Sequence, residues 1–226
     1  MVFGTNMALN KFQMSTDTKL SEQIENELLY LWNKAYGELY EEDWIDSEAI
    51  ISEGELDSDI TKILAFYGDG SNEDSFKRFI YINWALCIAA KPKINGYLNN
   101  RSEYDSILKD LKLWSENNSY SLIDAFAKYN LNTGDAGAAM EAIMVYQNML
   151  KIPTSQYIIE IVADSIDSCL QGTAICHGTI DKRAIFNWLI VDVFPNAYFY
   201  KLPNYIYASS FDINNWGYFE RVEEKK

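Results

Sequence analysis

Carboxylates spaced by one helical turn are the side chains of this chain that are best suited to catalysis. Asp43 and Asp46 are three residues apart, and Glu38 and Glu41 show the same spacing just before them. Residues three or four apart share one face of a helix, so each pair can present two carboxylates together. Helical enzymes use such pairs to hold Mg²⁺ on a diphosphate substrate. One hypothesis is therefore a metal-dependent helical enzyme that acts on a phosphorylated substrate.

The patterns of known helical metal enzymes are not reproduced, however. At 226 residues the chain is short for a helical terpenoid synthase. It lacks the two separate helices, one with Glu-x-x-Glu and one with Glu-x-x-Asp, of the all-α nucleotide pyrophosphohydrolases. A ferritin-like di-iron site needs Glu-x-x-His twice, and the chain has a single histidine. We therefore keep the Mg²⁺ enzyme as the alternative, and assign no catalytic residue, metal ligand or cofactor.

The cysteines and the histidine match no common metal or nucleophile motif. The chain contains Cys87, Cys169, Cys176 and, directly after the last of these, His177. Zinc knuckles place two ligands two to four residues apart, which this spacing does not reproduce. A cysteine nucleophile would need an electropositive pocket, and the sequence shows none. We expect buried, reduced thiols and a histidine in a loop, as in a cytoplasmic protein.

Negative charge is concentrated between Lys34 and Lys77, a stretch that we call the acidic segment. The whole chain has a formal net charge of −14, and the acidic segment holds thirteen carboxylates and one cation, Lys62. These carboxylates are Glu38, Glu41, Glu42, Asp43, Asp46, Glu48, Glu53, Glu55, Asp57, Asp59, Asp69, Glu73 and Asp74. Such an excess argues against nucleic acid and against an anionic membrane as partners, because both are bound through clustered Lys and Arg.

Apolar residues are interleaved with these charges. The stretch from Ala35 to Thr61 has ten carboxylates and no Lys or Arg, whereas an ordinary solvated helix face mixes both signs. Trp44, several isoleucines and Leu56 lie among the charges, and aromatic anchors inside a charged rim are typical of a protein-binding patch. The residues expected to contact a partner are Glu41, Glu42, Asp43, Trp44, Asp46, Glu48, Glu53, Glu55, Asp57 and Asp59. A solvated face that only keeps the protein soluble is the alternative.

In size, charge and helical content the chain resembles the small acidic immunity proteins of bacterial toxin systems, and the stretch from Glu41 to Asp46 is where the likeness is strongest. Many of those proteins cover the basic surface of a nuclease. The resemblance implies a non-enzymatic protein of the bacterial cytoplasm that masks a basic protein partner such as a toxin. It transfers no residue by position, and it leaves the oligomeric state open.

Hydrophobic periodicity predicts helices through most of the chain. The expected elements are 20–40, a short helix or turn near 44–51, then 60–67, 74–91, 102–115, 121–129, 136–150, 155–170 and 179–194. Ser21 is the expected N-cap of the first helix, and Gly68 is expected to end the helix over 60–67. Pro92 and Pro195 are expected to end two others, because proline lacks the amide that a helix interior needs.

These elements predict one all-α domain over residues 18–226, a single irregular bundle of about eight or nine helices, after a flexible segment over 1–17. The stretch from Pro195 to Phe219 holds nine aromatic residues and no helical period, so we expect an aromatic-rich extended C-terminal arm with a short strand or hairpin. The first residues lack a secretion-signal pattern, and no apolar stretch is long enough to span a membrane. A soluble cytoplasmic protein is therefore the expectation.

Overall fold

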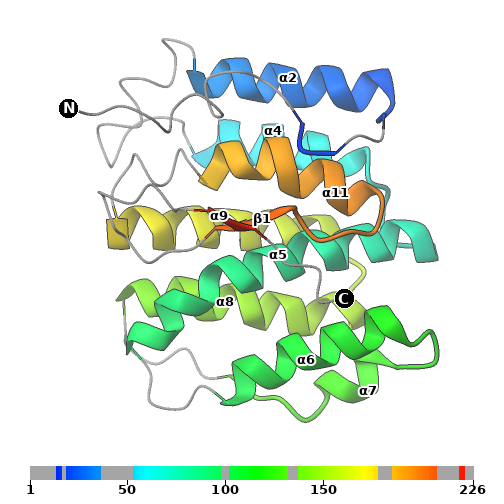
Figure 1. The fold of residues 1–226 in the computed structure, drawn as a ribbon, viewed down its shortest axis with the longest axis vertical. Helices are drawn as coiled ribbons and strands as arrows, with labels where there is room; N and C mark the ends of the chain where they lie inside the picture. Colours follow the sequence, from blue (N-terminus) through cyan, green and yellow to red (C-terminus); the bar gives the residue numbers. More distant parts are fainter. Residues whose placement is uncertain are drawn as a thin grey trace.

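Helix α5 (Glu73–Tyr97) runs through the centre of the fold (Figure 1). The computed structural model describes residues 14–16, 19–36, 53–97, 102–131, 137–177, 185–207 and 219–221. Helix α5 packs against α8 (Gly137–Lys151) and α9 (Ile158–His177), and these two also contact each other extensively. Tyr146 of α8 is fully buried and donates a hydrogen bond to the Cys87 carbonyl of α5 over 2.8 Å. These three helices form the middle of the core.

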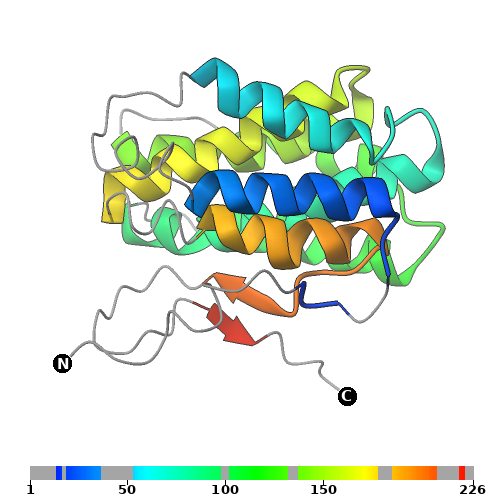
Figure 2. The ribbon, with the colours of Figure 1, turned by 90° about the horizontal axis from the view of Figure 1, so that it is seen from above.

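Helices α2 (Glu22–Tyr36) and α4 (Glu53–Ala65) lie together at one side of the bundle (Figures 1 and 2). The Ile24 amide lies 3.5 Å from the Ser21 hydroxyl oxygen, so Ser21 caps α2 as predicted. Helix α4 begins earlier than predicted and ends before Gly68, whose φ of +107° favours glycine. The end of this helix is therefore where the sequence placed it.

Helices α6 (Ser102–Glu116) and α7 (Leu122–Phe126) cover the opposite end of the bundle (Figure 1). Ser121 begins α7 by accepting a hydrogen bond from the Asp124 amide over 3.2 Å. The Tyr104 ring of α6 meets the Tyr146 ring edge-on, with 5.0 Å between centroids. Helices α6 and α8 lie within one residue of their predicted bounds, because each is an amphipathic stripe with a clear start and end.

Two predicted helix ends in the middle of the chain are wrong. Helix α5 continues past Pro92 to Tyr97, and the buried residues Ala90 and Ile94 on either side of the proline show why. The burial of these two side chains in the core offsets the cost of an interior proline, which is about 3 kcal/mol. Helix α9 runs to His177 instead of ending near residue 170, so this histidine lies in a helix and not in a loop.

Pro195 does not end the last long helix either. The chain is helical from residue 185, passes through a π-helical stretch, η2 (Leu189–Val193), and continues as α11 (Phe194–Tyr198). In this π turn the Phe194 amide bonds the Leu189 carbonyl, five residues earlier instead of the four of an α-helix. The Val191 carbonyl, four residues before Pro195, accepts a hydrogen bond from the Ser15 amide instead. The extended arm therefore starts after Tyr200 and not at Pro195.

Two short strands follow in the C-terminal region. Strand β1 (Tyr205–Tyr207) pairs antiparallel with β2 (Phe219–Arg221), with Tyr205 opposite Arg221. This ribbon confirms the predicted hairpin, and the fold as a whole is the predicted all-α bundle. No helix in the described parts of the chain is long and apolar enough to cross a membrane. Residues 1–13 and residue 17 of the predicted flexible segment lie outside the described residues.

Candidate functional site

The predicted partner-binding residues divide into two groups. Glu53, Glu55, Asp57 and Asp59 lie in the first half of α4. The others lie outside the described residues and are Glu41, Glu42, Asp43, Trp44, Asp46 and Glu48. The carboxylate pairs considered for Mg²⁺, which begin at Glu38, belong to the same undescribed stretch. The structure therefore describes the acidic segment only from Glu53 onward, where helix α4 begins.

Two ion pairs join α2 and α4 and fix them antiparallel. Lys34, near the end of α2, pairs with Asp59, and Lys62 Nζ lies 2.7 Å from Glu27 Oε1. The Tyr30 ring lies between the two ammonium groups, which are 5.7 and 5.5 Å from its centroid. The hydrogen bond to Glu27 raises the pKa of Lys62. Both lysine side chains are therefore engaged in contacts between α2 and α4.

Lys62 is the only cation of the acidic segment, and its ion-pair partner lies outside that segment. Glu27 is 9% exposed, so its carboxylate needs a partner to offset the cost of burial. Lys62 meets this need. Asp59 is the one predicted binding residue whose side chain is described, and Lys34 already occupies it.

The described parts of the chain contain neither a cluster of metal ligands nor a reactive cysteine. Among these residues no group of three or more His, Cys, Asp or Glu side chains is placed to hold a metal ion. Cys87 and Cys169 are free and buried, as predicted. Burial raises the pKa of both thiols, so they remain protonated at neutral pH and are poor nucleophiles.

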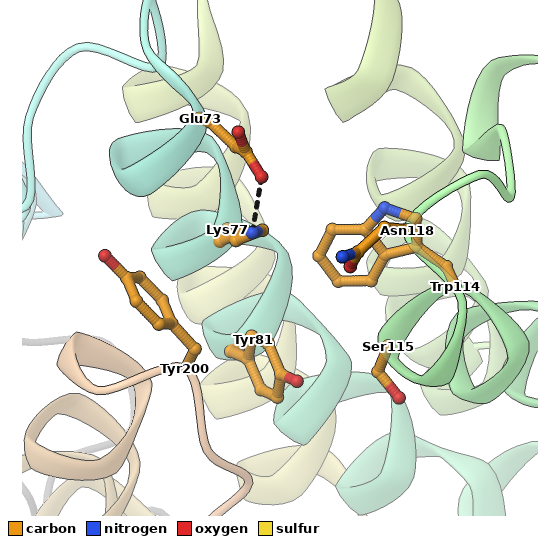
Figure 3. Close-up of a pocket in the computed structure, with 7 residues that line it drawn as sticks. All are labelled: Glu73, Lys77, Tyr81, Trp114, Ser115, Asn118 and Tyr200. Carbon is orange, nitrogen blue, oxygen red and sulfur yellow. Dashed lines mark hydrogen bonds and ion pairs between the residues drawn. The ribbon is translucent and has the colours of Figure 1, made fainter.

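A groove lies where α5, α6 and the end of α11 meet (Figure 3). It has a volume of about 190 Å³. We call it the aromatic groove, and its lining residues are Glu73, Lys77, Tyr81, Trp114, Ser115, Asn118 and Tyr200. Figure 3 shows Tyr200 on one side of Lys77 and Trp114 on the other. Three elements that are far apart in the sequence therefore contribute one aromatic ring each.

Helix α5 supplies one side of the aromatic groove through residues that are four apart. Glu73, Lys77 and Tyr81 follow one another along the same face of the helix. Lys77 Nζ lies 2.5 Å from Glu73 Oε1 and 5.9 Å from the centroid of the Tyr200 ring. The Tyr81 ring is tilted against the Trp114 ring, with 6.1 Å between centroids. The groove thus has aromatic walls and an internally neutralised pair of charges.

A buried carboxylate, Asp110, holds the part of α6 that carries Trp114. It accepts hydrogen bonds from the hydroxyls of Tyr120 (2.7 Å) and Tyr129 (2.6 Å), and Lys128 Nζ lies 2.9 Å away. Burial alone would raise the pKa of Asp110, but these three hydrogen bonds outweigh it and lower the pKa. Because Asp110 lies one turn before Trp114, the cluster fixes this wall and the loop after α6.

Tyr200 has a left-handed backbone conformation, with φ of +57°. It follows α11 in a Schellman motif, in which the Tyr200 amide bonds the Ala197 carbonyl (3.0 Å) and the Lys201 amide bonds the Asn196 carbonyl (3.1 Å). Glycine usually occupies this position, since a side chain there costs about 1–2 kcal/mol. Burial raises the pKa of the Tyr200 hydroxyl, and a hydrogen bond to Asp74 raises it further. The strained residue is held against the first turn of α5.

Sequence reasoning missed the aromatic groove because only part of its pattern is local. The four-residue spacing on α5 is visible, but nothing in the sequence connects it to Trp114 or Tyr200. No protein-family model, curated protein or solved structure matches the chain. The function therefore rests on charge and geometry.

Proposed function

We propose that this chain is a non-enzymatic acidic binding protein that masks a basic protein partner through its acidic segment. The observation that carries the proposal is the pairing of Lys62 with Glu27 over 2.7 Å. The only cation within the segment is thereby directed to a carboxylate outside it. Asp59 and Glu73 pair with Lys34 and Lys77, the two lysines that flank the segment, and the remaining carboxylates of the segment still far outnumber its single cation.

Uncompensated charge of one sign has a specific effect on binding. It attracts a cationic protein over several ångströms, raises the association rate and disfavours acidic competitors. The position of Glu53, Glu55 and Asp57 at the start of α4 adds to this effect at no structural cost, because carboxylates are favoured at the positive end of a helix. Trp44 and its apolar neighbours would supply the desolvated contacts that hold the partner.

A toxin-neutralising immunity protein is the particular role that we propose. Size, all-α fold and the charge distribution support this role, and so do the two free, buried cysteines, which suit the reducing cytoplasm. The partner in this role is a basic protein, and a bacterial nuclease toxin has the required chemistry.

The test is a binding measurement with the purified basic product of a gene that adjoins this one. Wild-type protein is expected to bind with an association rate that falls steeply between low and physiological salt. Reversal of Glu41, Glu42, Asp43 and Asp46 to Lys is expected to abolish binding.

A matched control reverses four carboxylates on other helices, at Glu103, Glu116, Asp124 and Glu160. This control changes the net charge equally but leaves the acidic segment intact, so it is expected to keep most of the affinity. Equal loss in both variants would mean that only net charge matters. Undiminished binding by the first variant would remove the acidic segment as the site.

A further inference from the structure

The size of the aromatic groove limits what it can hold. Its volume of about 190 Å³ is slightly larger than that of a protein cavity that accepts benzene, about 150 Å³. Pockets for nucleotides and other ligands of that size have volumes of about 300–1,000 Å³. The aromatic groove therefore has room for one six-membered ring, and the rest of a larger guest would extend out of it.

The charges in and beside the aromatic groove are already balanced. Glu73 and Lys77 neutralise each other over 2.5 Å, and Asp74 is hydrogen bonded to the Tyr200 hydroxyl. Arg78 lies 3.9 Å from the centroid of the Tyr198 ring next to the groove. A cationic guest would compete with Lys77, and an anionic guest would be repelled by Glu73. The ring that fits best is therefore uncharged.

The polar groups of the aromatic groove favour an aromatic ring over a sugar. The Ser115 hydroxyl donates to the Lys112 carbonyl over 2.8 Å and is also hydrogen bonded to Tyr81. A sugar ring needs several free donors and acceptors, whereas two neutral polar groups among the described lining residues have no intramolecular partner, the Asn118 side-chain amide and the Trp114 indole N–H. These two groups are enough for a single phenol hydroxyl. Aromatic walls gain from offset or edge contacts at centroid distances of about 4.5–7 Å.

We propose that the aromatic groove binds one tyrosine side chain of a partner protein, with its ring against the walls formed by Tyr81, Trp114 and Tyr200 and its hydroxyl at Asn118. Tyrosine is among the side chains that most often fill such anchor pockets in interfaces. The groove adjoins the last two carboxylates of the acidic segment, Glu73 and Asp74. This inference goes beyond the masking of a basic partner and does not depend on it, because the bound group is neutral.

The experiment is an NMR titration of ¹⁵N-labelled protein with N-acetyl-tyrosinamide. The chain has six tryptophans, and the Trp114→Phe variant identifies the Trp114 indole signal. We expect this signal to shift, with a dissociation constant on the order of 1 mM, as for a ligand of so few atoms. N-acetyl-argininamide and methyl glucoside, at equal concentration, are expected to shift it much less.

Two variants locate the binding. Tyr200→Ala removes one wall and is expected to weaken binding about fivefold. Tyr157→Ala, which removes a tyrosine that is 59% exposed just before α9, is the matched control and is expected to have no effect. No shift of Trp114 with N-acetyl-tyrosinamide, a stronger response to either other probe, or equal weakening by both variants would overturn the proposal. The variant in which Glu41, Glu42, Asp43 and Asp46 are replaced by Lys is expected to leave this titration unchanged. The titration and the test of the proposed function can therefore fail independently.

Discussion

The Ser15 amide donates a hydrogen bond to the Val191 carbonyl, with 2.8 Å between nitrogen and oxygen. This bond supplies the donor that Pro195, four residues after Val191, cannot provide. The Ser15 hydroxyl also donates to the carboxylate of Asp192. A residue near the start of the chain thus completes a helix near its end.

Asp192 is the centre of this junction, and we expect Asp192→Asn to destabilise the fold by about 1–3 kcal/mol. The carboxylate is 1% exposed and accepts hydrogen bonds from the Asn196 side chain (2.8 Å) and from the amides of Asn204 and Tyr205 (both 2.9 Å). An asparagine would direct its NH₂ group at some of these donors. Urea unfolding measures the loss, and Asp164→Asn, an exposed change on α9, is the control.

The same variant has an expected pH dependence. Burial raises the pKa of Asp192, so the folded state binds this proton more tightly than the unfolded chain does. The stability difference between wild type and Asp192→Asn is therefore expected to grow as pH falls through the raised pKa toward the unfolded value of about 3.9. A difference that shrinks in acid would contradict this reasoning.

Asp110 is expected to show the opposite pH dependence. Burial raises its pKa, but hydrogen bonds from Tyr129, Lys128 and Tyr120 outweigh burial and lower it. The stability that these bonds provide is present above the unfolded pKa of about 3.9 and is lost as pH falls through the folded pKa. We expect Asp110→Asn to be destabilising at pH 7 and nearly neutral in strong acid, as urea unfolding at each pH would show.

Tyr200 allows the cost of its left-handed backbone to be measured. Tyr200→Gly and Tyr200→Ala both remove the ring, but only glycine relieves the strain at φ of +57°. We therefore expect the glycine variant to be more stable than the alanine variant by about 1 kcal/mol in thermal or urea unfolding. Equal stabilities would mean that the Schellman motif is not maintained without the ring.

Gly68 and Gly70 both have positive φ, but their neighbours differ. A Cβ at Gly68 would lie 2.4 Å from Ser75 Cβ, which is fixed to the backbone at the start of α5. A Cβ at Gly70 would meet Ile158 Cδ1, also at 2.4 Å, which is the movable end of a side chain. We expect both alanine variants to be destabilised, Gly68→Ala by about 2 kcal/mol or more and Gly70→Ala by less, in urea unfolding.

Local sequence patterns predicted where most helices lie. They were wrong about the two helices that were expected to end at a proline. Ser21 and Gly68 act through bonds to residues a few positions away, so their roles as cap and stop are visible in the sequence. Pro92 and Pro195 also look like stops, but distant contacts decide their outcome. The Ser15 amide reaches Val191 only in the folded chain, and no local pattern shows this bond.

The candidate sites also differ in whether the sequence or only the structure reveals them. The acidic segment is a property of composition, and the sequence identifies it directly. The redirection of Lys62 to Glu27 depends on the packing of α2 on α4, and the aromatic groove depends on three elements that meet at Lys77. Charge could therefore be predicted from the sequence, whereas its compensation and the groove required the structure.

Addition of Mg²⁺ separates the two functions that the sequence suggested. A site on Glu38, Glu41, Asp43 and Asp46 would bind Mg²⁺ in the folded state alone and would stabilise it by about 2.7 kcal/mol at one hundred times the dissociation constant. For a chain of this length that is a rise in Tm of roughly 5–11 °C. We expect no such rise from a binding protein, in a thermal melt started from EDTA-treated protein.

Ionic strength has to be matched with NaCl in that melt, because salt also screens the repulsion among carboxylates. A variant with Glu38→Gln, Glu41→Gln, Asp43→Asn and Asp46→Asn completes the test. If these side chains repel one another without a metal, their neutralisation is expected to leave the Tm unchanged or raise it. A rise with Mg²⁺ beyond the NaCl control that disappears in this variant would favour the metal-dependent enzyme over the binding protein.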